Sequence, residues 1–312
     1  MPPLVSIIVP CYNAAPWLAP TLESALAQQG IAAEIIVVDD GSTDESLRIA
    51  RQFESRGVRI ETQANRGASA ARNRGLRLAQ GAFLQFLDAD DLLDPSKIRL
   101  QVDMAAGLDP GMVLCSAWSR FTDTPGPAAG PPELLCRDAD PVSWVVAKFA
   151  HNAMMHPAAW LVPRALAEIA GPWDESLSLD DDGEYFTRVV LASRGVRCCP
   201  AARSFYRSGL AGSLSRAKSD RAWESAYRSL RLSGARLLAA EDSPRTRGAY
   251  ATALQHYIYD AYPRAAACRR EAAGKVRELG GSSLPPPGGP KYRLACRVLG
   301  WRLAKRLASL RT

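Results

Sequence analysis

An acidic cluster, Asp88-Ala89-Asp90-Asp91, directly follows an apolar run and has residue types that suit metal chemistry. Two carboxylates separated by one residue can face the same region, and Mg²⁺ or Mn²⁺ is typically held by one or two carboxylates together with substrate phosphate oxygens. Asp88 and Asp90 therefore fit a site for a metal-bound diphosphate. The same pattern also fits a polar turn before a helix that begins near Asp94, because aspartates are common in turns.

Polar residues also follow two earlier apolar runs. Asp39-Asp40-Gly41-Ser42 comes after residues 34–38, and Tyr12-Asn13 comes after residues 5–10. A carboxylate there can accept a hydrogen bond from a nucleobase or a ribose, and the Tyr12 ring offers a surface on which a base can stack. A turn, a helix cap and simple packing are the alternatives for the same residues.

The segment from Asn65 to Gly75 carries three arginines, Arg66, Arg72 and Arg74, among small residues. The guanidinium group matches phosphate oxygens well, so the segment fits the charge of a diphosphate. The alternative is the solvated basic start of a helix.

The elements that must position these residues alternate between short apolar runs and helical patterns. We expect strands at 5–10, 34–38 and 82–87, because continuous apolar runs are typical of strands buried on both faces of a parallel sheet. Helices are expected from Trp17, from a capping box at Ser42 to Glu45, and from Asp94-Pro95. The fold class is α/β, and ligands of such sheets bind beyond the carboxyl ends of the strands.

Composition indicates a folded globular protein. The chain has 312 residues, of which 47% are hydrophobic and 23% charged, and its net charge of +7 favours anionic partners. Seven cysteines without CxxC spacing favour a reduced, cytoplasmic setting. The N-terminus lacks the features of a signal peptide, and no stretch reaches the roughly 18 to 20 apolar residues that a membrane-spanning helix needs.

Four segments in this order, VSIIVPCYNAAPWL, IIVVDDGSTDES, NRGASAARNRGL and FLDADD, resemble family 2 glycosyltransferases. The resemblance implies a Rossmann-like GT-A fold with a mainly parallel central sheet flanked by helices, a donor that is usually a UDP-sugar, and metal-dependent inverting transfer. It implies that Tyr12 and Asp40 hold the nucleobase and that Asp88 contacts the ribose end of the donor. It also implies that Asp90, together with Asp88, binds the metal through the DxD motif. The complete predicted donor site comprises Pro10, Tyr12, Asn13, Asp39, Asp40, Asn65, Gly67, Arg72, Asp88 and Ala89.

A later segment, AGPWDESL at 170–177, resembles the family's stretch before its catalytic acid. The pattern that follows places the general base at Asp182, with Asp181 and Arg188 as a second acid or acceptor contacts. Asp180 makes the acidic run triple, so a shift of one residue changes the assignment. The alternative is an acid-rich helix start stabilised by the helix dipole.

One departure from the family concerns a downstream histidine near the diphosphate or the metal. Here Tyr206-Arg207-Ser208-Gly209 contains none, which leaves a third protein ligand open. Arg207, Ser213 and Ser215 are candidates for donor or acceptor contacts. His151 and His156 fit structural or acceptor-side roles better than metal ligation.

The resemblance covers about residues 3 to 215. We expect a GT-A domain over 1–218, with a donor half at about 1–110 and an acceptor half at about 111–218. A helical C-terminal extension over 219–279, a linker over 280–290 and a basic amphipathic helix over 291–312 complete the chain. That last helix fits two roles: it lies on anionic lipid with Trp301 and the leucines inserted, or it packs on the protein or a partner.

The predicted function is hexosyl transfer from a nucleotide-sugar to a hydroxyl of a glycan or lipid-linked acceptor in polysaccharide biosynthesis. The chain is expected in the cytoplasm or peripherally on the inner face of the membrane, with Mn²⁺ or Mg²⁺ and without nucleic acid. A non-catalytic nucleotide-sugar-binding pseudoenzyme or partner-binding module is the alternative. A Rossmann dinucleotide enzyme is disfavoured, since no GxGxxG follows the first strand.

Overall fold

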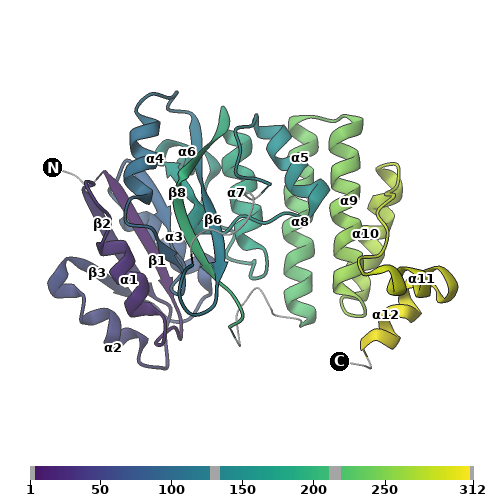
Figure 1. Cartoon of the computed structure of the whole chain (residues 1–312), viewed down its shortest axis with the longest axis horizontal. Helices are drawn as coiled ribbons and strands as arrows, with labels where there is room; N and C mark the ends of the chain where they lie inside the picture. The colour runs from purple at the N-terminus through teal and green to yellow at the C-terminus, as the bar shows by residue number, and fades with distance from the viewer. Residues whose placement is uncertain (1–3, 127–133, 211–218, 310–312) are drawn as a thin grey trace.

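An eight-stranded sheet in the order β3-β2-β1-β4-β7-β6-β8-β5 forms the centre of the first two thirds of the chain. The computed structural model describes residues 4–126, 134–210 and 219–309 (Figure 1). The strands are β1 (Val5–Cys11), β2 (Ala33–Asp39), β3 (Val58–Thr62), β4 (Phe83–Phe86), β5 (Leu92–Leu93), β6 (Met112–Phe121), β7 (Trp160–Pro163) and β8 (Gly195–Arg207). Strands β1 to β4 pair in parallel, β7 runs antiparallel to β4 and β6, and β8 is parallel to β6.

The three predicted strands are confirmed as β1, β2 and β4. Every residue of β1 is buried, as continuous apolar sequence predicts for a strand covered on both faces. Strand β3 escapes sequence analysis, because Arg59 and Glu61 interrupt its apolar pattern at the exposed edge of the sheet.

Helices cover both faces of the sheet and continue beyond it. They are α1 (Leu18–Leu26), α2 (Ser46–Arg51), α3 (Ala68–Leu78), α4 (Lys97–Ala105), α5 (Pro141–His151), α6 (Arg164–Ala170), α7 (Asp181–Ala192), α8 (Asp220–Ala240), α9 (Pro244–Ala261), α10 (Ala266–Glu278), α11 (Pro290–Leu299) and α12 (Trp301–Ser309). Two 3-10 turns lie at Glu54–Arg56 and Pro157–Ala159.

Two helix starts differ from the prediction. The capping box expected at Ser42 is wrong, because α2 begins only at Ser46, and the Ser42 hydroxyl accepts a hydrogen bond from Asn13 N at 3.0 Å. Asp44 accepts one from Ser46 N at 2.9 Å just before the helix. Helix α4 likewise begins at Lys97 rather than next to Asp94. In both places the aspartates shape a turn ahead of the helix.

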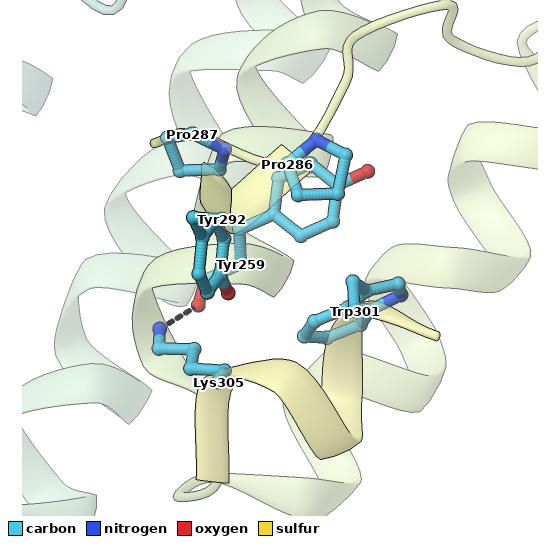
Figure 2. A pocket seen from close by; sticks show the side chains of 6 residues that line it. All are labelled: Tyr259, Pro286, Pro287, Tyr292, Trp301 and Lys305. Atoms are coloured by element: carbon cyan, nitrogen blue, oxygen red, sulfur yellow. Dashed lines mark hydrogen bonds between the residues drawn. The ribbon is translucent and has the colours of Figure 1, made fainter. Parts of the chain in front are cut away.

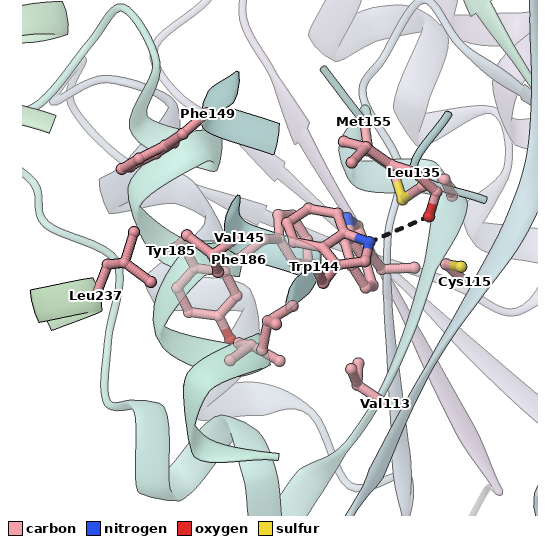
Figure 3. Close-up of a cluster of buried hydrophobic side chains, with 14 of the residues drawn as sticks. Val113, Cys115, Leu135, Trp144, Val145, Phe149, Met155, Tyr185, Phe186 and Leu237 are labelled. Carbon is pink, nitrogen blue, oxygen red and sulfur yellow. Dashed lines mark hydrogen bonds between the residues drawn. The ribbon is translucent and has the colours of Figure 1, made fainter. Parts of the chain in front are cut away.

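The helical extension shares its hydrophobic core with the sheet. Leu237 of α8 and Tyr250 of α9 belong to the same buried cluster as Trp160 of β7 and Tyr185 of α7. Figure 3 shows Leu237, Phe149 and Tyr185 among the side chains of this cluster. The boundary expected at residue 218 therefore does not separate two independent cores.

The end of the chain contains two helices where the sequence predicts one over 291–312. Gly300, with a φ of 74°, separates α11 from α12. This left-handed conformation is easy for glycine and interrupts a helix. Between α10 and α11, residues 279–289 form neither helix nor strand, and none of the described helices is both long enough and apolar enough to span a membrane.

The structure pairs Cys136 with Cys198 as a disulfide, whereas the sequence predicts reduced cysteines. The backbone bridge between Ala139 and Val196 brings the loop before α5 against β8, so the two Cα atoms lie 5.5 Å apart. That separation is normal for a disulfide. The reduced setting is therefore not supported at this pair.

Candidate functional site

A cavity of about 1230 Å³ opens at the carboxyl ends of β1, β2 and β4 and extends to α5, α7, α8 and α9. Open α/β sheets place their ligands at this edge. Twelve of the fifteen residues predicted to contact donor, metal or acceptor line the cavity: Pro10, Tyr12, Asn13, Asp40, Asn65, Gly67, Arg72, Asp88, Ala89, Asp90, Asp181 and Asp182.

The loops after β1 and β2 are tied together at the mouth of the cavity. Asn13 adopts a positive φ of 49°, and its side-chain oxygen accepts a hydrogen bond from Thr43 N at 2.8 Å. The neighbouring Tyr12 side chain is 51% exposed. Tyr12 therefore presents an open aromatic ring on which a planar base can stack.

Asp40 organises the turn that leads into α3. Its carboxylate accepts hydrogen bonds from Arg66 N at 2.9 Å, from Gly67 N at 2.7 Å and from the Gln63 amide at 2.8 Å. Asp39 does not line the cavity, which corrects its prediction as a donor contact. It is buried beneath the loop and accepts a hydrogen bond from Ser42 N at 3.2 Å.

Arg72 joins two acidic clusters that are far apart in the sequence. This buried guanidinium donates to Asp88 at 2.7 Å and to Asp181 at 2.8 Å, and it lies 4.4 Å from the centroid of the Trp173 ring. The other two arginines of the segment do not line the cavity. Arg66 pairs with Glu175 at 2.6 Å, and Arg74 pairs with Glu61 at 2.7 Å.

The acidic cluster after β4 divides between the cavity and the interior. Asp88 and Asp90 line the cavity. Burial, together with the carboxylates of Asp91 and Asp88, raises the pKa of Asp90 to about 8. Asp91 has no exposed surface and binds Arg207 N at 2.8 Å and His156 Nδ1 at 2.9 Å. Asp91 therefore shapes the turn, while two carboxylates face the open space.

His156 is a structural residue, although it lines the cavity. Its Nδ1 bonds to Asp91, and its Nε2 bonds to the Ser204 hydroxyl at 2.9 Å. Burial lowers the pKa of His156 to about 3, so the ring is neutral. With both ring nitrogens engaged, His156 does not fill the place of the histidine that the family motif has and this chain lacks.

Arg207 binds the backbone of the acidic cluster and does not line the cavity, which corrects its prediction as a donor or acceptor contact. It is buried, and it donates to the Asp90 carbonyl at 2.9 Å and to the Thr122 carbonyl at 2.7 Å. Its guanidinium also lies 4.5 Å from the centroid of the Trp17 ring. Ser213 and Ser215 lie outside the described residues.

Three consecutive aspartates at the start of α7 have three different environments. Asp180 has a φ of 64° and accepts a hydrogen bond from the Ser229 hydroxyl at 2.7 Å. Asp181 binds Arg72 and, at 2.8 Å, the Ser69 hydroxyl. For Asp182, the only side-chain hydrogen bond recorded within the described residues comes from Gly183 N at 2.8 Å.

Asp182 is therefore the member of the run whose carboxylate is available to a substrate in the cavity. Burial raises its pKa to about 7, and the neighbouring carboxylates of Asp181 and Asp180 act in the same direction. A carboxylate with a pKa near neutral is suited to take up a proton at physiological pH. This geometry favours the register that the sequence pattern indicates.

Arg188 lies away from the cavity, which corrects its prediction as an acceptor contact. Its guanidinium binds Glu184 at 2.8 Å, one helical turn earlier in α7, and the carbonyl oxygens of Ala170 and Gly171. The spacing of four residues between Glu184 and Arg188 explains this position, because residues i and i+4 meet on one face of a helix. Arg188 ties α7 to the end of α6.

Sequence reasoning misses one whole lobe of the cavity. Residues of α8 and α9 line it together with α5, and Lys148 of α5 donates to the Gly183 carbonyl at 3.2 Å next to the acidic run. The apolar part of this lobe consists of Phe149, Trp223, Ala226, Leu230, Ala253 and Tyr257. These residues lie mostly beyond the recognisable motifs, so helical periodicity was the only signal they offered.

The chain resembles known glycosyltransferases in sequence and in fold. Residues 6–134 match the family described as Glycosyl transferase family 2. The chain is therefore similar to glycosyl transferase family 2 over its first 134 residues, which include β1 to β6 and the acidic cluster after β4. An uncharacterised glycosyltransferase of Escherichia coli K12, YibD, is 40% identical over 122 residues, which cover 38% of this chain and 36% of YibD. The chain thus spans about a third of the length of this curated relative.

Two solved structures share the fold of almost the whole chain. Staphylococcus aureus TarS 1–349 in complex with UDP-GlcNAc has a TM-score of 0.67 at 19% identity, over 98% of this chain and 91% of that one. The mannosyltransferase PcManGT of Pyrobaculum calidifontis, in complex with GDP-Man and Mn²⁺, has a TM-score of 0.54 at 19% identity, over 99% and 88%. The predicted GT-A fold is confirmed.

Proposed function

We propose that this protein is a family 2 glycosyltransferase that transfers a hexose from a nucleotide-sugar, a UDP-sugar, to a hydroxyl of a glycan or lipid-linked acceptor in cytoplasmic polysaccharide biosynthesis. One observation carries the proposal. Asp88 and Asp90 line the same cavity as Asp182, and Arg72 bridges Asp88 to the neighbour of Asp182, Asp181. A diphosphate-binding edge and a proton acceptor therefore share one space.

The donor is proposed to lie along the loops after β1, β2 and β4. The exposed Tyr12 ring stacks on the base, and the turn organised by Asp40 lies beside the nucleoside, with Asn65 and Gly67 on the cavity wall. The complexes of TarS with UDP-GlcNAc and of PcManGT with GDP-Man support a nucleotide-sugar in this fold. Arg72 supplies positive charge next to Asp88, where the diphosphate would lie.

A divalent metal fits the residues that line this edge. Asp90, with its pKa raised to about 8 by burial and by two neighbouring carboxylates, is a group whose negative charge a cation would stabilise. Asp90 and Asp88 offer the hard oxygen ligands that Mg²⁺ and Mn²⁺ prefer. When bound, such a metal offsets charge on the departing diphosphate. The Mn²⁺ complex of PcManGT supports this assignment.

The proposed chemistry needs one displacement and one proton transfer. Asp182 accepts the proton of the acceptor hydroxyl while that oxygen forms a bond to the anomeric carbon. The bond from the anomeric carbon to the diphosphate oxygen breaks, and the nucleoside diphosphate leaves with the electron pair. Attack from the face opposite to the leaving group inverts the anomeric configuration. The lobe formed by α5, α8 and α9 lies next to Asp182 and would receive the acceptor.

A pseudoenzyme that binds the nucleotide-sugar without turnover is the second candidate, and the missing histidine at Tyr206-Arg207-Ser208-Gly209 is the observation that favours it. The availability of Asp182 and the presence of both Asp88 and Asp90 in the cavity favour the enzyme.

Nucleotide release from a panel of UDP-sugars and GDP-mannose separates the two candidates. With Mn²⁺, the wild type should release nucleotide from at least one donor, and a chelator should abolish this. Asp90→Ala should lower the rate by about 10²-fold or more, the scale of losing an electrostatic contact to the leaving group. Asp103→Ala, at an exposed site in α4, is the matched control and should resemble the wild type.

Donor binding without release by the wild type would favour the pseudoenzyme. Full activity of Asp90→Ala would remove the metal role assigned to that residue.

A further inference from the structure

We propose that α11 and α12 dock this protein on an anionic phospholipid bilayer. The docking face, called the terminal surface below, consists of Leu294, Val298, Leu299, Leu303 and Leu307 with the basic side chains around them. The proposal deepens the proposed function only in its last step, where the bilayer presents the acceptor to the cavity.

The inner side of α12 is already occupied by the protein. Trp301 lies between Tyr259 and Tyr262, with ring centroids 5.0 and 5.2 Å away, and Ala304 is 4% exposed. Figure 2 shows Trp301 and Lys305 projecting from α12 toward Tyr259 and the proline-containing linker. Trp301 therefore packs against the protein and holds α12 in place, which corrects the expectation that it inserts into lipid.

Both helices carry exposed apolar side chains. Of the nine exposed large hydrophobic side chains in the described residues, five fall between Leu294 and Leu307. Leu303 and Leu307 are one helical turn apart, as are Leu294 and Val298, and their exposed fractions range from 45 to 75%. Exposed apolar side chains gathered in this way mark an interaction surface, and the packing of Trp301 and Ala304 holds α12 in place.

The charge around this row identifies the partner. The stretch from Lys291 to Arg306 contains six Lys or Arg residues and no acid, and of these Lys305 lies on the inner side, bonded to carbonyl oxygens of α9. Interfacial helices that combine leucines with many basic residues bind at the headgroup boundary of anionic bilayers. The core of a protein interface, by contrast, is usually poor in charged residues. Because the two helices have only 10 and 9 residues, they lie on a bilayer rather than cross it.

The terminal surface lies beside one end of the cavity. Lys305 of α12 donates to the carbonyl oxygens of Tyr259 and, at 3.3 Å, Asp260, and Asp260 itself lines the cavity. Figure 1 shows α11 and α12 next to the end of α9. A bilayer bound there would lie close to the lobe that contains Trp223 and Tyr257. Given the proposed function, the acceptor hydroxyl is then carried by a membrane lipid.

Sedimentation of the full chain with vesicles tests the docking. Vesicles of phosphatidylcholine with about one third phosphatidylglycerol should bind the protein, whereas pure phosphatidylcholine should not. Arg293→Gln combined with Arg297→Gln should weaken binding roughly thirtyfold, from about 1 kcal/mol for each basic residue near an anionic surface. Leu303→Ser combined with Leu307→Ser should weaken it at least about tenfold, because two leucines lose apolar contact.

Matched controls carry the same changes on other faces. Arg51→Gln combined with Arg77→Gln, and Ile169→Ser, also replace exposed residues and should bind vesicles like the wild type. Hydrogen exchange of the wild type with vesicles should slow in 291–309. Equal binding by the terminal-surface variants, loss of binding in the controls, or protection confined to other elements would overturn the proposal.

Donor binding, measured on the same variants without vesicles, keeps the two proposals apart. Retained donor binding with no sedimentation of the wild type would overturn membrane docking and leave the glycosyltransferase assignment standing. Sedimentation of a wild type that does not bind the donor would overturn the glycosyltransferase assignment and leave membrane docking standing.

Discussion

Neighbouring residues of one type have different roles because the backbone points them in different directions. Asp180 turns back onto Ser229, Asp181 pairs with Arg72, and Asp182 faces the cavity. Gly183 leaves room for the Asp180 carboxylate in this position, since a Cβ atom at Gly183 would lie only 2.1 Å from an Asp180 carboxylate oxygen. The assignment of the base thus depends on the local packing of one helix start.

The raised pKa of Asp182 predicts a pH dependence for nucleotide release. A general base must be deprotonated, and burial raises the pKa of Asp182 to about 7. Release should therefore be slow below that pH, because the group is protonated, and should rise toward a plateau above it. The measurement is the rate at saturating donor from pH 5.5 to 8.5, with donor affinity as the control. A plateau that already extends down to pH 5.5 would contradict this role.

Sequence motifs predicted most of the residues that line the cavity at the carboxyl ends of the strands, but not the direction of each side chain. Tyr12, Asp40 and Asp88 line the cavity as expected. Arg188 and Arg207 come from the same kind of motif evidence, yet both are buried as supports. Spacing along the chain does not reveal on which side of a strand or helix a side chain finds hydrogen-bond partners. For these arginines the partners are Glu184 and backbone carbonyl oxygens.

At the scale of elements, strands covered on both faces were predictable, whereas the edge strand and the helix starts were not. Strand β1 is apolar except for Ser6 and is buried throughout. The start of α2 was misplaced because Ser42 bonds to Asn13, which is 29 residues away in the sequence. A contact between distant loops leaves no local pattern for sequence reasoning to find.

The close contact between α8 and α9 predicts that a methyl group added at Gly234 lowers the stability of the protein. A Cβ atom at Gly234 would lie 2.2 Å from the buried Tyr250 ring. Gly234→Ala should therefore lower the free energy of unfolding by about 1–3 kcal/mol, the usual cost of overpacking. Denaturant unfolding gives this value.

Gly248→Ala, in the exposed interior of α9, is the matched control. Nothing lies within 4 Å of its added Cβ, so it should raise stability by up to about 1 kcal/mol. Destabilisation by Gly248→Ala equal to that of Gly234→Ala would mean that the helix contact is not the cause.

At the scale of the whole molecule, the helical extension completes the fold of the sheet domain. Leu237, Tyr250 and Leu254 belong to one buried cluster with Phe86 and Tyr185. Sequence analysis placed a boundary near residue 218, where motif support ends, but the physical core continues. Buried apolar contacts between distant segments do not follow the limits of a family motif.

Truncation tests this shared core. A chain that ends at residue 218 should lose its cooperative thermal transition or unfold at a much lower temperature, because α8 and α9 no longer cover the core. A chain that ends at 289 lacks only α11 and α12 and should keep a cooperative transition near that of the full protein. Equal transitions for the full chain and for the chain ending at 218 would show that the extension is dispensable for folding.

The central claim is that Asp182 takes the acceptor proton in a nucleotide-sugar transferase. The most direct measurement is nucleotide release by Asp182→Asn with the best donor of the panel, beside wild type and the exposed control Asp103→Asn. Asparagine keeps the size of the side chain and an oxygen for Gly183 N–H but cannot act as a base. We predict a rate lowered by about 10²- to 10⁴-fold with unchanged donor affinity. A wild-type rate in Asp182→Asn would contradict the account.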